Sequence, residues 1–154
     1  MFQIHGLPDT PFAPLFGLPE GELAARGIRR VLVTEPNAAP CRVGLADAEP
    51  GQTVLLLNHV HQPADTPYRA SHAIYVREGA VAVQPAPGTV PEMIRRRLLS
   101  VRAFGPDHMI VDAEVVEGAV VAPLLADWVA RPDVAYIHLH FARRGCFAAT
   151  VLRA

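Results

Sequence analysis

The sequence predicts an α+β protein, a single domain over residues 1–154 with a largely antiparallel (mixed) curved β-sheet and two or three helices packed on it. Segments rich in β-branched and aromatic residues outnumber segments with helical spacing, and short turns join most of them. No repeat of about 20 to 50 residues recurs, which excludes a solenoid. Because short turns connect antiparallel neighbours, we expect one curved sheet or two sheets formed by its splitting.

The first half of the chain alternates strand patterns with one short helix. Pro19 and the acidic residues after it suit the first turn of a helix, and Gly27 suits the position just past its end. Val54 to Leu57 is apolar on both faces, which indicates a central strand covered on two sides. We expect a helix over 19–26, strands over 2–6, 28–35, 41–45, 53–61 and 71–77, and a return through 81–84 that forms a hairpin with the last of these.

Two more helices and two hairpins are expected in the second half. Pro91 opens a helix that we expect to reach Leu99, with Ile94 and Leu98 on one side. A further helix is expected over 120–131, with an apolar stripe that places Trp128 in the core. The hairpins pair residues 101–104 with 108–116 and residues 134–141 with 146–152.

Composition excludes several classes of function. The formal net charge is −1, so no electrostatic field favours a nucleic acid, and no apolar run approaches the ~18 residues of a membrane span. We therefore expect no nucleic-acid partner, no membrane partner and a cytoplasmic location. The chain contains no lysine, which excludes a lysine Schiff base and a phosphate-loop lysine. Cys41 and Cys146 are too few for a disulfide framework.

The loop between the strands 53–61 and 71–77 is the densest group of chemically versatile side chains. Arg69 could bind a carboxylate or phosphate with two parallel hydrogen bonds, or it could hold the loop to backbone carbonyls. Tyr68 and Ser71 add hydroxyl groups, and His61 and His72 add imidazoles. Function tends to lie on loops held by a rigid scaffold, so we select this loop as a candidate ligand-binding segment.

A second candidate surface lies on the strand 134–141. Side chains alternate along a strand, so Tyr136, His138 and His140 share one face. If the strand 108–116 is its neighbour, Asp112 or Glu114 could lie opposite the histidines, an arrangement suited to orienting a base or holding a metal. The commoner alternative is that this polar face is the solvent side of the sheet.

Histidines on two strands also raise the question of a metal. His59 and His61 share a face, as do His138 and His140, and two such pairs could form a four-histidine site. The glutamate that would follow in a metal-binding jelly roll is missing after His61, and histidines bonded to backbone carbonyls are the alternative. We assign no metal ligand and no cofactor.

Several segments together resemble the bacterial family catalogued as domain of unknown function 1203. They are Cys41 with Arg42, residues 47–51, residues 61–74, residues 101–104, residues 109–118 and residues 145–149. The resemblance extends over nearly the whole chain, and residues 61–74 are its most specific part. It implies a single-domain bacterial protein and assigns no activity, cofactor or catalytic residue.

Three hypotheses for the function follow from these residues. The first is a small-molecule site for an anionic or polar ligand, in which Tyr68, Arg69, Ser71 and His138 bind and His61, His72 or His140 acts as acid or base if the protein is an enzyme. The second is a non-catalytic module that binds a partner or forms a homodimer. The third is a metal site through His138 and His140.

Overall fold

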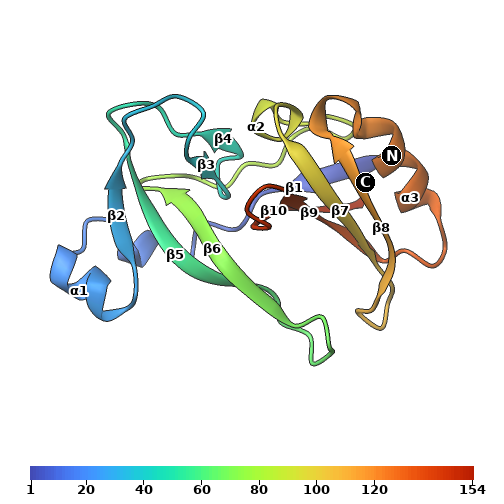
Figure 1. Ribbon diagram of the computed structural model, residues 1–154, viewed down its shortest axis with the longest axis horizontal. Helices are drawn as coiled ribbons and strands as arrows, with labels where there is room; N and C mark the ends of the chain where they lie inside the picture. The colour runs from blue at the N-terminus through green and yellow to red at the C-terminus, as the bar shows by residue number, and fades with distance from the viewer. The chain divides into compact units, whose positions relative to one another are not determined.

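The computed structural model describes residues 1–154 and contains two mostly antiparallel five-stranded sheets with three short helices (Figure 1). Sheet A has the strand order β1-β10-β9-β7-β8, and sheet B has the order β2-β5-β6-β3-β4. Strands β3 and β6 pair in parallel. The predicted α+β class with a largely antiparallel sheet is confirmed, in the form of two sheets.

Sheet A is formed by β1 (Phe2–His5), β7 (Leu98–Phe104), β8 (Ile110–Glu117), β9 (Tyr136–Phe141) and β10 (Phe147–Arg153). Sheet B is formed by β2 (Arg29–Leu32), β3 (Pro40–Cys41), β4 (Ala46–Asp47), β5 (Thr53–Gln62) and β6 (Ala70–Arg77). The helices are α1 (Glu20–Ala25), α2 (Glu92–Arg95) and α3 (Ala122–Ala130), with single 3₁₀ turns at Ala13–Leu15 and Gly118–Val120.

The chain divides into two compact units. The sheet A unit comprises Met1–His5, Val60–His72 and Gln84–Ala154, and the sheet B unit comprises Gly6–His59 and Ala73–Val83. The end of β5 and the start of β6 therefore belong to the sheet A unit, whereas the rest of both strands belongs to the sheet B unit.

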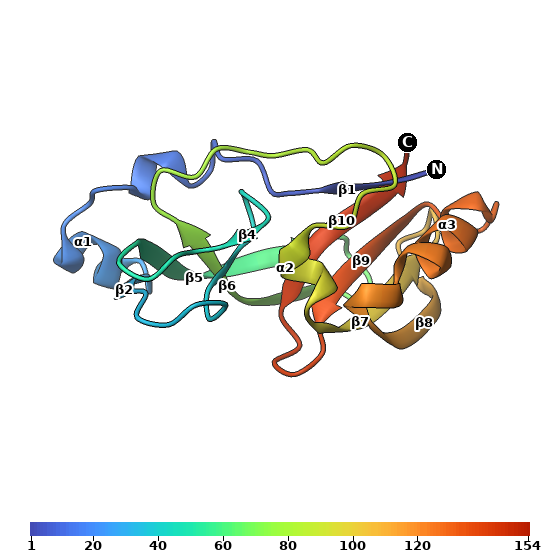
Figure 2. The ribbon, with the colours of Figure 1, turned by 90° about the horizontal axis from the view of Figure 1, so that it is seen from above.

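In the sheet A unit, helix α3 covers one face of the sheet, toward β10 and β1 (Figure 2). Its buried residues Leu125 and Trp128 belong to the core, as the apolar stripe predicted. The strands contribute the alternate side chains that share this face, among them Val101, Leu139 and Val151, which are fully buried. The opposite face of the sheet carries the remaining, alternate side chains of the same strands.

In the sheet B unit, the long strand β5 lies between β2 and β6 and supplies the centre of the core. Leu55 and Leu57 from β5 pack with Ile74 and Val76 from β6 and with Leu23 from α1. The prediction of a central strand at Thr53 to His61 is thus confirmed, and the strand extends one residue further.

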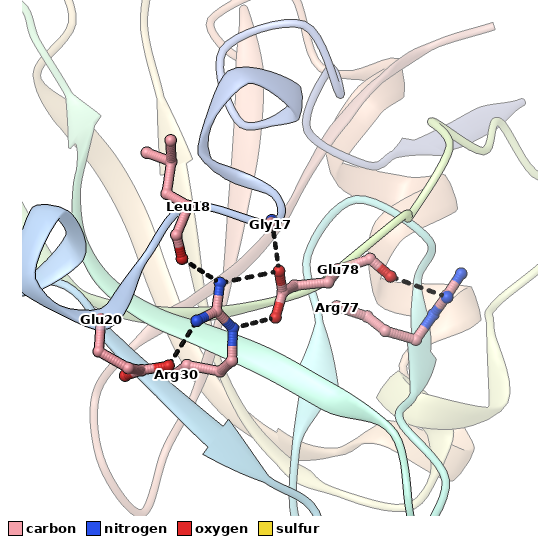
Figure 3. A network of polar contacts seen from close by, with 6 residues as sticks. All are labelled: Gly17, Leu18, Glu20, Arg30, Arg77 and Glu78. Atoms are coloured by element: carbon pink, nitrogen blue, oxygen red, sulfur yellow. Dashed lines mark hydrogen bonds and ion pairs between the residues drawn. The ribbon is translucent and has the colours of Figure 1, made fainter.

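An arginine on β2 ties the start of helix α1 to the end of β6 (Figure 3). The Nε of Arg30 donates to Oε1 of Glu78 at 2.5 Å, its Nη1 pairs with Glu20, and its Nη2 donates to the carbonyl of Leu18 at 2.8 Å. The backbone N–H of Gly17 donates to the second oxygen of Glu78 at 2.9 Å. This pairing lowers the pKa of the Glu78 carboxyl and so keeps it ionised.

Three predicted elements are wrong. Of the strand expected over 41–45 only Cys41 is extended, and residues 42–45 form the turn between β3 and β4. Residues 81–84 form no strand, because both neighbours of β6 are already β5 and β3, so no edge of β6 is free for a hairpin. The helix expected to reach Leu99 ends at Arg95, since Leu98 begins β7 and pairs with Glu117 of β8. Ile94 therefore belongs to α2 and Leu98 to β7, and their spacing of four residues does not reflect one continuous helix.

None of the helices has both the length and the apolar character that a membrane span requires.

Candidate ligand pocket on sheet A

The candidate site begins with the face of sheet A that α3 does not cover. Strand β7 lies between β8 and β9, and its register places Arg102 opposite His138 and Ser100 opposite His140. On the other side of β9, Thr150 of β10 lies opposite His138. Since directly opposite residues share a face, these five polar side chains form one group.

This polar face is not the solvent side of the sheet, so the commoner alternative weighed for it is wrong. His138 is 5% exposed and His140 is 1% exposed. The ring of His61, from the end of β5, lies 4.8 Å from the ring of His140 and 6.2 Å from that of His138, measured between centroids. His61 also stacks on Phe147 at 5.6 Å. We call His61, His138 and His140 the imidazole cluster.

The protonation state of His140 follows from its contacts. Its Nδ1 lies 3.0 Å from the carbonyl oxygen of Gly145, which can only accept a hydrogen bond, so Nδ1 carries the proton. Burial, and to a smaller extent the charge of Arg102, lowers the pKa of His140 from 6.5 to about 3. The ring is therefore neutral near pH 7, and its Nε2 is a buried lone pair that accepts no hydrogen bond.

A pocket of about 430 Å³ opens beside the cluster. Its lining combines imidazole and phenol rings with a short turn of backbone, and consists of His61, Gln62, Pro63, Ala64, His108, Tyr136 and His138. The volume lies within the range of small-molecule sites, about 300 to 1,000 Å³. No carboxylate, guanidinium or ammonium group lines it.

Tyr136 is the best-anchored polar group of this pocket. Its hydroxyl accepts a hydrogen bond from Nε2 of Gln62 at 2.8 Å and lies 2.8 Å from Nδ1 of His108. Gln62 is 3% exposed, and its Oε1 accepts from the backbone N–H of Ala64 at 3.2 Å, so the amide is fixed in turn. Burial raises the pKa of Tyr136, so the phenol stays protonated and able to donate.

His108 reaches Tyr136 from an unusual backbone conformation. Its φ is 63°, in the left-handed region that non-glycine residues rarely adopt. The backbone N–H of His108 donates to the carbonyl of Gly105 at 3.0 Å, which fixes the β7–β8 turn. Outliers of this kind are common at functional sites, and here the conformation places an imidazole at the rim of the pocket.

The loop residues selected from the sequence have different surroundings. Tyr68 meets Phe104 edge-on, with 6.3 Å between ring centroids, and Phe104 stacks on Tyr136. The Nη1 of Arg69 donates to the carbonyl of Pro63, so Arg69 holds the loop to the backbone, which was the alternative weighed for it. Ser71 and His72 lie on β6, and neither they nor Tyr68 and Arg69 line the pocket.

The expected pairing of Asp112 or Glu114 with the histidines is wrong. Strands β8 and β9 are not neighbours, because β7 separates them. Asp112 lies opposite Ala103 and Glu114 opposite Val101, so both carboxylates are on the α3 face. Asp112 pairs there with Arg131 at 2.5 Å.

Several residues of the site were not selected from the sequence. Tyr136 shares its face with His138, which the alternation did show, but its pairing with Gln62 joins residues 74 positions apart. Arg102 alternates with the apolar Val101 and Ala103, and this alternation could have assigned it to a polar face. Nothing local in the sequence could have placed His108.

A metal centre finds no support in this arrangement. No group of three or more His, Cys, Asp or Glu side chains is placed to hold a metal ion. His59, part of the four-histidine hypothesis, lies in the sheet B unit beside Phe12, with 6.2 Å between ring centroids.

Comparison with known proteins yields one family. The profile of a family described as "Protein of unknown function (DUF1203)" matches residues 38–153. No curated protein and no solved structure matches the chain.

Proposed function

The chain belongs to the DUF1203 family, whose function is unknown, and we propose from its pocket that the protein binds a polar or anionic small molecule on sheet A. The observation that carries this proposal is the hydroxyl of Tyr136, held by Gln62 and His108 at the wall of the pocket. A few fixed polar groups in a concave, ring-lined site are typical of small-molecule binding.

The hydrogen bonds at Tyr136 leave it able to serve a ligand. A phenol has one donor and two acceptor positions, and Gln62 occupies one acceptor position. When Nδ1 of His108 donates to the second, the phenol proton is available to an acceptor on the ligand. The Nε2 of Gln62 donates to Tyr136 and its Oε1 accepts from Ala64, so the role of this amide is to position Tyr136.

The imidazoles supply acid–base groups should the ligand be turned over. Of the three candidate histidines, His61 and His140 lie in the cluster and His61 lines the pocket. His140 is neutral and can accept a proton through Nε2, and its ring lies 4.8 Å from the ring of His61, which lines the pocket. His72 lacks both positions, so we rank it below the other two.

The experiment is a fragment screen on the full chain by NMR, with native mass spectrometry to detect any ligand retained on purification. Compounds should shift the signals of Tyr136 and His138. The variant Tyr136→Phe should bind the same compounds about tenfold more weakly, the cost of about one hydrogen bond. Tyr75→Phe, on β6 in the sheet B unit, is the matched control. A screen without shifts at the pocket, or equal affinity for Tyr136→Phe, would reject the proposal.

A partner-binding or homodimeric module is the second candidate. The observation in its favour is the pair of valines on the edge strand β8, Val111 at 40% and Val115 at 58% exposed. Exposed apolar side chains on an edge strand are a common route to association. Light scattering over a hundredfold range of concentration tests the homodimer, since a constant monomer mass would exclude self-association.

A further inference from the structure

We propose that the ligand of this pocket is an uncharged, planar aromatic compound with a hydrogen-bonding group, such as an aromatic amide. This inference rests on the proposed function, because it assigns a chemical class to the ligand of the same site. Three observations carry it, namely a row of rings in the lining, a lining without charged side chains, and the hydrogen-bonding capacity of Tyr136.

Four rings of the lining follow one another in a row, which we call the ring row. The ring centroids of His61 and His138 are 6.2 Å apart, and those of His138 and Tyr136 are 5.2 Å apart. The centroid of His108 lies 5.8 Å from that of Tyr136. Rings attract one another at centroid distances of about 4.5 to 7 Å. A planar ring placed against the row can therefore contact several of its members at once.

Two buried phenylalanines hold the ring row in place. Phe104 stacks on Tyr136 at 5.1 Å and lies 4.9 Å from His138. Phe147 stacks on His61 at 5.6 Å and meets His138 edge-on at 5.2 Å. Both phenylalanines are buried, and neither lines the pocket. The rings that a ligand would touch are thus fixed before it binds, which lowers the entropic cost of binding.

The charges around the pocket disfavour a charged ligand. No side chain of the lining carries a charge that could pair with one. Burial raises the pKa of Tyr136, and the negative charge of Asp107 adds to this effect, so an anion beside the phenol would be repelled. A cation would give up water without gaining a carboxylate partner in the lining. An uncharged ligand avoids both costs.

Tyr136 can serve the hydrogen-bonding group of such a ligand in either direction. When Nδ1 of His108 carries the proton, it donates to the phenol oxygen, and the phenol can donate to a carbonyl of the ligand. When Nε2 of His108 carries the proton, the phenol donates to Nδ1, and its second acceptor position can receive an N–H of the ligand. An amide offers both a carbonyl and an N–H, so it matches both states.

The test is an NMR titration of the full chain with benzamide, benzoate and cyclohexanecarboxamide. Benzoate replaces the amide by a charged group, and cyclohexanecarboxamide replaces the planar ring by a saturated one. Benzamide should bind about tenfold more tightly than benzoate, which finds no counter-charge. It should bind about three- to tenfold more tightly than cyclohexanecarboxamide, the range expected for an aromatic contact. Binding should shift the signals of His61, Tyr136 and His138.

Three variants separate the ring row from the hydroxyl. His61→Leu removes one ring and should reduce the preference for benzamide over cyclohexanecarboxamide. Tyr136→Phe keeps the row and should weaken both amides about tenfold without changing this preference. His5→Leu makes the same change on β1, outside the pocket, and should behave as the wild type. If His61→Leu does not fold, His108→Asn removes another ring of the row, and asparagine suits the left-handed backbone at this position.

The outcomes distinguish this inference from the proposed function. Binding of benzoate or cyclohexanecarboxamide at the pocket as tightly as benzamide would overturn the inference and leave the proposed function standing. An undiminished preference for benzamide in His61→Leu and His108→Asn would do the same. If none of the three compounds shifts the pocket signals, the inference is wrong, and the proposed function falls only if the wider fragment screen also yields no ligand there.

Discussion

At the scale of single residues, burial decides the chemistry of the imidazole cluster. His140 is held neutral by its surroundings, and the Gly145 carbonyl fixes which nitrogen carries the proton. Protonation of this imidazole would place a charge in a buried environment, which destabilises the folded state. The stability of the fold and the protonation of the site are therefore linked.

The linkage predicts a loss of stability in mild acid. The pKa of His140 is about 3 in the folded chain and about 6.5 in the unfolded chain, so the unfolded state binds more protons between these values. The contribution of neutral His140 to the free energy of unfolding is therefore complete above about pH 6.5 and is lost as the pH falls toward 3. Between about pH 7 and pH 5 the free energy of unfolding should fall by about 2 kcal/mol through this residue alone.

Urea denaturation of wild type and His140→Gln at the two pH values measures this loss. The variant should lose about 2 kcal/mol less than the wild type on acidification. His5→Gln removes an imidazole outside the cluster and should retain the wild-type dependence. The same pH dependence in all three proteins would show that His140 is not held neutral.

The sequence predicts which side chains of β9 share a face, but not which distant residues contact that face. Alternation along β9 correctly placed Tyr136, His138 and His140 on one face, because this rule depends only on local backbone geometry. It could not show that His61 covers that face, since this contact joins residues distant in the chain. The roles of the seven selected residues stay predictions, tested by the ligand experiments above.

At the scale of elements, strand β8 protects its own edge. The N–H groups of Ala113 and Val115, which point away from β7, donate to the carboxylates of Asp112 and Glu114 at 2.9 Å each. Free edge donors invite pairing with another strand, and carboxylates placed on them discourage it. The exposed valines of β8 can therefore remain on the surface without forcing association.

Removal of one such carboxylate should expose the edge. We expect Glu114→Val to form dimers or larger species at concentrations where the wild type does not, because it frees the Val115 donor and adds apolar surface. Glu117→Val makes the same change on the same strand at a residue that caps no edge donor, and is the control. Light scattering after size exclusion measures both, and equal masses for the two variants would contradict this account.

Elements that depend on neighbouring turns were the most predictable. The β7–β8 and β9–β10 hairpins follow from short turns between apolar runs, and α3 follows from its apolar stripe. The expected strand at 81–84 failed because the sequence does not show that β6 already has two partners. Pairing partners are a property of the whole sheet, and no local pattern encodes them.

At the scale of the whole molecule, two strands are shared between the compact units. Residues 53–59 of β5 and 73–77 of β6 belong to the sheet B unit, while the loop-proximal ends of both strands belong to the sheet A unit. Unfolding of one unit shortens the paired length of both strands and so should destabilise the other unit. We infer that the units unfold together, as the single domain predicted from the chain length requires.

A core substitution in one unit, observed from the other, tests this cooperativity. Leu55 is fully buried in the sheet B unit, so Leu55→Ala should cost about 3 kcal/mol. The single tryptophan, Trp128, reports on the sheet A unit through its fluorescence. If the units unfold together, Leu55→Ala lowers the urea midpoint seen by Trp128 as much as the midpoint seen by circular dichroism. Leu125→Ala, in the Trp128 unit, lowers the fluorescence midpoint in either case and is the control. An unchanged Trp128 midpoint in Leu55→Ala would mean that the units are separate domains, because destabilisation of one would not reach the other.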